Sequence, residues 1–441
     1  MKKTLLLTSL VASMVAIAGT TGSVEGYNEN EATFVKDQDA TFTAKKLGVK
    51  TEVKVNGTGF SFGGDFKAED LSLGNATKDK FLDHSKVWAK YELPELKGVK
   101  SYVQATAEPK FIGADKGSAE LEGQVSYKYD TLTFGLNSKT NFPFVKSDNS
   151  TNYGEDVKST HKVFVESEKD KDVFVKGLKD VKANVEIKHN YIKKDNAKAE
   201  DIVHYVSGEV SAKYDAVKDL ELEGKVAFKK NIKSGEEIGD YEVLGTKLFA
   251  KVPANYIHSY ELKGTYKGVK HLTLSAKPFV AHVNISKAAA KREDNVLYGV
   301  ELGAEYKMLN DKLTLTGKSL LAGVHNRVFD DSKNPKLTKT NTGYFVFDAN
   351  AKYDYSVTDK FTVSPEANAN LELKVTKPAD KLVTEPTLTL TPKVSAEYKA
   401  TDTLTLKGSV ETPVKFKKVG TEFKYTDTQV KTSLNLKYEW K

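Results

Sequence analysis

The sequence predicts an all-β protein, an antiparallel up-and-down transmembrane β-barrel of about 14–20 strands with about 18 favoured. A phrase with a short chain reversal recurs, apolar and charged residues alternate beside each reversal, and longer polar connections separate the repeats. Helical periodicity is hardly visible after residue 18. A sheet of this many strands must hide its edges and cover its apolar face.

The recurring phrase has the pattern of a β-hairpin. Its clearest copies are "AEYKATDTLTLKG" at 396–408 and "AEYKMLNDKLTLTG" at 304–317. In each copy an alternating strand ends near a tyrosine, a few turn-forming residues follow, and Leu-Thr-Leu begins the next strand. Related phrases start at residues 126, 212, 264 and 351, and looser ones occupy 45–55, 94–105 and 176–187. Such short reversals join antiparallel neighbours, so the nine predicted turns favour 18 strands.

The two faces of each predicted strand differ in polarity. After Asp402, for example, Leu404 and Leu406 share one face and Thr405 and Lys407 the other. The same alternation extends over the final segment and over 49–55, and its charged face predicts the residues that line a pore. These residues are Lys50, Glu52, Lys54, Lys407, Glu411, Lys415, Lys431, Lys437 and Glu439.

Two architectures compete for these strands. Stacked soluble sandwiches would bury the apolar faces between sheets, but they seldom alternate short turns with long loops over a whole chain. A transmembrane barrel turns the apolar face to lipid and the charged face to water, and it has two such unlike rims. Tyrosines recur just before the short turns, as an aromatic girdle would require: Tyr127, Tyr214, Tyr266, Tyr306, Tyr353 and Tyr398.

The N-terminus predicts export. Lys2 and Lys3 precede a largely apolar run that ends in Ala16-Ile17-Ala18, so residues 1–18 are expected to be a signal peptide. Residues 19–45 form a polar segment, either a periplasmic extension or a first strand, and residues 46–441 form the barrel. Cysteine is absent, which excludes disulfides and a lipoprotein anchor. The net charge of +7 comes from well-mixed signs and gives no support to nucleic-acid binding.

Catalytic motifs are weak. The stretch Gly59-Phe60-Ser61-Phe62-Gly63 matches a nucleophile elbow, with Asp83 and His84 downstream, but an elbow needs a strand-turn-helix context and no helix pattern follows. The eight histidines are scattered without the close spacing of a zinc site. The sequence therefore predicts no enzyme, no catalytic residue, no metal and no cofactor.

The whole chain after residue 18 resembles Gram-negative outer-membrane β-barrel proteins of the general porin, or major outer-membrane protein, type. The final strand, "VKTSLNLKYEWK", is similar to the signal that the barrel-assembly machinery reads in that family, here Leu434, Leu436, Tyr438 and Trp440. The resemblance implies an outer-membrane location in contact with lipid, small solutes as the transported partners, and a homotrimer as one assembly.

Passive diffusion of small hydrophilic solutes is the function this resemblance implies. Lysines outnumber glutamates among the predicted pore residues, which suggests a mild preference for anions, although mixed charges could equally serve only to keep a wide pore wet. The alternative function is a structural or adhesive barrel whose extracellular loops bind host or neighbouring-cell partners.

Overall fold

The computed structural model describes residues 19–72, 85–108, 117–143, 156–192, 200–232, 237–238, 241–243, 246–249, 252–253, 255–288, 291–330, 336–376 and 383–440. The expected signal peptide at 1–18 lies outside them. Strands and their connections make up the described residues, none of which belongs to a helix long and apolar enough to cross a membrane.

One continuous sheet forms the wall of the molecule. Its strands are β1 (Thr20–Val35), β2 (Thr41–Val55), β3 (Phe60–Ser72), β4 (Lys86–Glu92), β5 (Val99–Glu108), β6 (Ser118–Tyr129), β7 (Leu132–Pro143), β8 (Asp156–Ser167), β9 (Leu178–Ile192), β10 (Glu200–Tyr214), β11 (Leu220–Asn231), β16 (Tyr256–Val269), β17 (Leu272–Ala288), β18 (Lys291–Met308), β19 (Leu313–Asp330), β20 (Lys336–Tyr353), β21 (Tyr355–Thr358), β22 (Phe361–Thr376), β23 (Val383–Lys399), β24 (Leu404–Glu411), β25 (Val414–Val419) and β26 (Glu422–Trp440). Two small pairs lie between β11 and β16: β12 (Glu237–Ile238) with β15 (Val252–Pro253), and β13 (Tyr241–Val243) with β14 (Thr246–Phe249).

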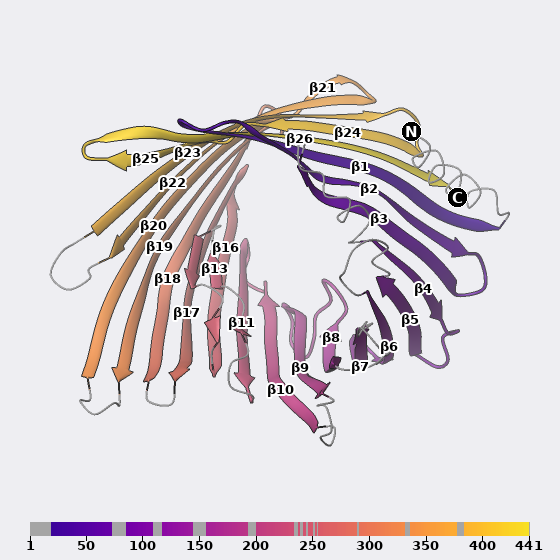
Figure 1. Cartoon of the computed structure of the whole chain (residues 1–441). Coiled ribbons are helices and arrows are strands. Elements are labelled where there is room, and N and C mark those ends of the chain that lie inside the picture. The colour runs from indigo at the N-terminus through magenta and orange to yellow at the C-terminus, as the bar shows by residue number, and fades with distance from the viewer. Residues whose placement is uncertain are drawn as a thin grey trace, which may run out of the picture.

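The sheet closes into a barrel because its first strand pairs with its last. β1 lies antiparallel to β2 on one side and to β26 on the other, from Gly22 opposite Trp440 to Val35 opposite Asp427. β21 continues β20, and β25 continues β24, so the 22 strands of the sheet make 20 positions around the wall. Figure 1 shows β1 and β26 side by side at this seam.

Twenty positions fall within the predicted range but exceed the favoured 18. Nine short connections lie on one rim, here called the lower rim, and join β2 through β25; all nine are among the described residues. β1 and β26 each connect to a neighbour only at the upper rim, because their lower ends are the ends of the barrel chain. Counting two strands for each lower-rim turn gives 18 and leaves out β1 and β26, which have no such turn.

The phrase at 45–55, predicted to be a turn, lies inside β2, and the turn follows at 56–59. Gly48 serves a different purpose. A Cβ at this position would lie 2.6 Å from the Tyr27 hydroxyl oxygen, so the missing side chain lets the Tyr27 ring lie close to the wall. Tyr27 then donates a hydrogen bond to Asp65 Oδ1 at 2.5 Å. The segment 19–45 contains β1 and the start of β2, so the wall begins at Thr20 and not at residue 46.

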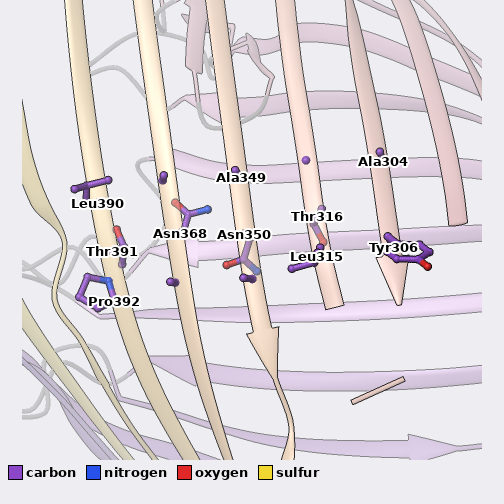
Figure 2. Close-up of a pocket in the computed structure, with 14 residues that line it drawn as sticks. Ala304, Tyr306, Leu315, Thr316, Ala349, Asn350, Asn368, Leu390, Thr391 and Pro392 are labelled. Atoms are coloured by element: carbon purple, nitrogen blue, oxygen red, sulfur yellow. The ribbon is translucent and has the colours of Figure 1, made fainter. Parts of the chain in front are cut away.

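The wall has one apolar and one polar face. Figure 2 shows a stretch of β18 to β23 where Ala304, Ala349 and Leu390 line a shallow hollow of about 610 Å³, with Tyr306 and Pro392 at its ends. The opposite face of the same stretch presents charged side chains, namely Glu305, Lys318, Asp348, Glu366 and Lys393. A spanning barrel needs its apolar surface toward lipid, so the apolar face is the outer one and the charged face lines the lumen.

Close packing of an indole on a glycine marks the seam. Trp440 lies over Gly22, where a Cβ would come within 2.5 Å of Trp440 Cζ2 and would also clash with the Glu52 carbonyl oxygen. The indole Nε1 donates to Thr20 Oγ1 at 3.4 Å, and the ring stacks on Tyr438 at a centroid separation of 6.3 Å. The closing strand therefore requires a residue without a side chain at position 22.

The substitution Gly22→Leu should destabilise the barrel by about 1–3 kcal/mol, the usual cost of forcing a side chain into a filled space. The urea midpoint of unfolding in detergent micelles measures this change. Gly26→Leu is the matched control, since Gly26 lies on the same face of β1 and a Cβ there meets nothing within 4 Å. Equal loss of stability in both variants would contradict the packing argument.

Candidate functional site

Rows of alternating charge cross the inner wall. One row runs over six neighbouring strands from β20 to β1, and another crosses the seam from β26 to β4. The first consists of Lys352, Glu366, Lys393, Glu411, Lys431 and Glu31, each opposite the next in register. The second consists of Lys437, Glu25, Lys50, Asp65 and Lys86. Opposite charges in facing positions attract one another, so each row nearly cancels its own field.

Side-chain distances agree with this cancellation. The Glu411 carboxylate lies 3.9 Å from Lys393 Nζ and 3.8 Å from Lys431 Nζ. Outside these rows, Lys407 Nζ lies 2.9 Å from Glu397 Oε2. The lumen is therefore highly charged along its wall but locally close to neutral.

The structure places all nine predicted pore-lining residues on this charged face. Lys50, Glu411, Lys431 and Lys437 belong to the two rows, and Lys407 faces Glu397. The remaining residues pair along or across a strand: Lys54 with Glu52 at 3.4 Å, Glu439 with Lys437 at 2.5 Å, and Lys415 opposite Thr389 and Asp427.

The inner face also carries polar networks on strands whose faces the sequence left unassigned. Tyr102 donates to Glu122 Oε1 at 2.6 Å, and Asn137 Nδ2 donates to the same oxygen at 2.8 Å. Lys90 Nζ lies 4.2 Å above the centre of the Tyr102 ring. These contacts reach across β4 to β7, which the curved inner surface brings together. The alternation in 99–108 would have revealed Tyr102 as an inner residue.

One part of the inner wall is apolar instead of charged. Four residues of β17 lie on the same inner face as Lys277 but are buried and apolar, namely Phe279, Ala281, Val283 and Ile285. Inward positions of the next three strands extend this inner apolar patch: Leu297, Leu320, Ala322, Val324, Tyr344 and Val346. A patch of this kind inside a wet lumen must be covered.

The connection between β11 and β16 supplies the cover. Val243 of β13 and Leu248 of β14 are only 6% and 4% exposed because they pack into the inner apolar patch. Figure 1 shows β13 beside β16 and β17. β13 and β14 therefore lie inside the barrel and narrow the lumen next to β17 through β20. We call the described residues of 232–255 the inner loop.

Two sequence signals could have predicted the inner loop. Apolar residues occupy both alternation classes in 278–285, 320–324 and 344–347, where the other strands alternate. The long connection also contains isolated apolar residues at Val243 and Leu248. Each signal alone is ambiguous, because a two-sided apolar strand is also typical of a buried core.

The outer face holds the predicted tyrosines near the lower rim. Five of them are 38–46% exposed and Tyr353 is half-buried against Tyr355, with ring centres 6.4 Å apart. Their partners in register are largely apolar, for example Leu272 and Leu315 beside Tyr306. Their role as a girdle remains a prediction.

Two histidines that are far apart in sequence meet on the outer face. His161 Nε2 lies 2.9 Å from His189 Nε2, and His161 Nδ1 lies 3.0 Å from Ser138 Oγ.

In the described part of the chain, no three side chains of the metal-ligating types come together. Ser61 of the elbow-like stretch lies within strand β3, while Asp83 and His84 fall outside the described residues.

At the lower rim, Asp354 lies in the break between β20 and β21. Ser364 Oγ donates to its Oδ1 at 2.5 Å, and Lys352 Nζ lies 2.9 Å from the same oxygen. The hydrogen bond from Ser364, and then that from Lys352, lower the pKa of Asp354 below its ordinary value. This carboxylate therefore stays ionised and fixes the turn of the chain into β21.

Comparison with solved structures finds similarity to several outer-membrane proteins at low sequence identity. OmpT of Vibrio cholerae in its trimer form is 11% identical with a TM-score of 0.36, and the match covers 96% of this chain and 100% of that one. The outer membrane channel DcaP of Acinetobacter baumannii is 10% identical over 96% and 99% of the two chains, with a TM-score of 0.35. The siderophore receptor PirA of Pseudomonas aeruginosa is 9% identical over 95% and 80%, with a TM-score of 0.49.

The closed wall and its lipid-facing apolar surface decide the class. The chain is an outer-membrane β-barrel. No protein-family model and no curated protein matches the sequence, so its class is established by architecture and not by sequence similarity.

Replacing Val243 and Leu248 together by aspartate should release the inner loop from the wall, since a carboxylate cannot be buried unpaired in the inner apolar patch. Single-channel conductance should rise and the loop should become sensitive to added protease. The matched control is Ile232→Asp, which adds a charge to the same loop at a side chain that is 56% exposed. An unchanged conductance with an equally protected loop would contradict the docking.

Proposed function

We propose that the barrel is a porin through which small hydrophilic solutes diffuse passively across the outer membrane. The observation that carries this proposal is the charged inner wall from β20 through β4, which the described residues of the inner loop leave uncovered because they pack on the apolar patch of β17 to β20. Barrels of 16–18 strands are wide enough to leave an aqueous channel, and this wall has 20 positions. Solutes would pass between the inner loop and the charge rows of β20 through β4.

The charge rows support weak selectivity. Because lysines and acids alternate, a permeating ion meets both signs within each row, and a strong preference has no structural basis. The proposed preference is for anions, since six of the nine sequence-selected residues are lysines. It is mild because Lys54, Lys407, Lys431 and Lys437 have acidic partners within 4 Å.

Two further roles belong to this proposal. The outward residues of β26, Leu434, Leu436, Tyr438 and Trp440, lie beside β1 at the seam, where assembly machinery would act during closure. A homotrimer is the proposed assembly. No side chain is assigned a catalytic role.

Reversal potentials across a planar bilayer in a salt gradient test the proposal. The wild-type barrel should conduct with a small potential of the sign that indicates anion preference. Replacing Lys393 and Lys431 by glutamate leaves Glu411 between like charges, so this variant should prefer cations. Lys360→Glu, in a lower-rim turn outside the strands, should leave the sign unchanged.

Clear cation selectivity of a conducting wild-type barrel would refute the proposed anion preference but not the proposed channel function. A purified, folded barrel that does not conduct would favour the alternative function, a surface barrel whose loops bind other cells.

A further inference from the structure

Arginine is almost absent from the chain, and its two copies lie on adjacent strands. Of the 67 lysines and arginines only two are arginines, Arg292 and Arg327. They occupy adjacent strands, where Asp294 lies opposite Arg327 and Phe329 opposite Arg292. The residue opposite Arg292 is therefore only two positions along β19 from Arg327.

The alternation assigns both positions to the outer face. Position 292 is an even number of residues from Tyr298 and Leu302 on β18, so it lies on the same lipid-facing side as these exposed residues. Arg327 shares its face with Leu321 on β19 for the same reason. An arginine on the lipid-facing side is costly within the hydrocarbon layer, so its height on the wall decides what it can contact.

Arg327 stands at the level of the lipid headgroups. It follows Leu313, the lower end of β19, by 14 residues, which at about 3.3 Å per residue and a tilt of roughly 40° gives a height of about 35 Å. The apolar band of such barrels is only about 25 Å tall. Below Arg327, outward residues such as Leu321 are apolar, whereas the outward positions at and next to Arg327 include His325 and, on the facing strands, Asp294 and Lys339.

Arg327 belongs to a polar belt that crosses six strands. We define the outer belt as Lys230, Tyr256, Asn284, Asp294, Arg327 and Lys339, which face one another in register from β11 to β20. Its one acid, Asp294, is already engaged: Asn284 Nδ2 donates to its Oδ1 at 2.5 Å, and His282 Nε2 lies 3.6 Å from the same oxygen. The outer belt thus has an excess of positive charge.

The guanidinium of Arg327 has no acidic partner among the described residues, although Asp294 lies directly opposite. Its Nε makes no hydrogen bond within the described chain. Arg327 as a whole is partly exposed, so an anion that approaches from the lipid side can accept from the terminal N–H groups of the guanidinium. Arginine is the residue suited to this task, because its planar fork matches two phosphate oxygens at once and lysine cannot reproduce that geometry.

We propose that the outer belt binds the phosphate group of an anionic lipid in the outer leaflet, with Arg327 and Lys339 as the contacting residues. The location on the lipid-facing surface favours a lipid phosphate over a soluble one. Tyr298 and Leu321, on the outer face below the outer belt, provide an apolar surface on which the acyl chains of the same lipid lie.

Lipid binding by the purified barrel in dodecyl maltoside micelles tests this site, with native mass spectrometry as the readout. Diphosphorylated lipid A should bind at least tenfold more tightly than its dephosphorylated form. Arg327→Gln should weaken binding of the diphosphorylated form about tenfold, the loss expected for a charge-assisted hydrogen bond. Arg327→Lys should fall between, since it keeps the charge and loses the fork.

The control variant is Lys360→Gln, which removes a positive charge from the opposite rim and should bind like the wild type. Inorganic phosphate should compete only weakly, and strong competition would indicate a soluble-anion site. Equal binding of both lipid forms to the wild type would overturn the proposal without any variant. Unchanged lipid binding by Arg327→Gln would overturn the assignment of Arg327, once far-UV circular dichroism shows that the variant is folded.

Discussion

The pairing of β1 with β26 is the constraint on which the rest of the molecule depends. Backbone groups at a sheet edge cannot remain unpaired in a membrane, and this one pairing removes both edges together. Closure also gives all strands one common outer face and one common inner face, so every strand must turn its apolar residues toward lipid. The bare Gly22 beneath Trp440 is a local consequence, since the last strand can lie against the first only if the indole has room.

The inner face solves two problems with different chemistry. Most of it carries alternating charges, whose individual pairs contribute little to stability, with a typical value of about 0–1 kcal/mol for exposed pairs. Their value is a wet surface whose field is nearly cancelled. The inner apolar patch on β17 to β20 has a different use, because burying Val243 and Leu248 holds the inner loop in the lumen. In the proposed porin, charge keeps the pathway hydrated and hydrophobic packing limits its width.

Local features of this fold could be predicted and distant contacts could not. The recurring phrase predicts turns at Asp130 and Asp219, and both residues lie in lower-rim turns, where they adopt positive φ. The alternation likewise separates Leu406 from Lys407, and the register of β24 with β26 puts them beside Leu436 and Asn435 on opposite faces of the sheet. Gly48 misled because glycine serves close packing as well as turns, and one sequence does not distinguish the two uses. The docking of Leu248, and the position of Arg327 opposite Asp294 and Lys339, depend on contacts and register between strands that the sequence pattern does not give.

Liposome swelling with uncharged solutes tests the central claim, that an open aqueous pathway runs between the inner loop and the charge rows. Uncharged probes separate the width of the pathway from its charge. Vesicles containing the wild-type barrel should swell rapidly in small sugars and progressively more slowly as the sugar grows, with a larger size limit when Val243 and Leu248 are both replaced by aspartate. Vesicles that do not swell in any sugar, although the barrel is inserted and folded, would contradict the account.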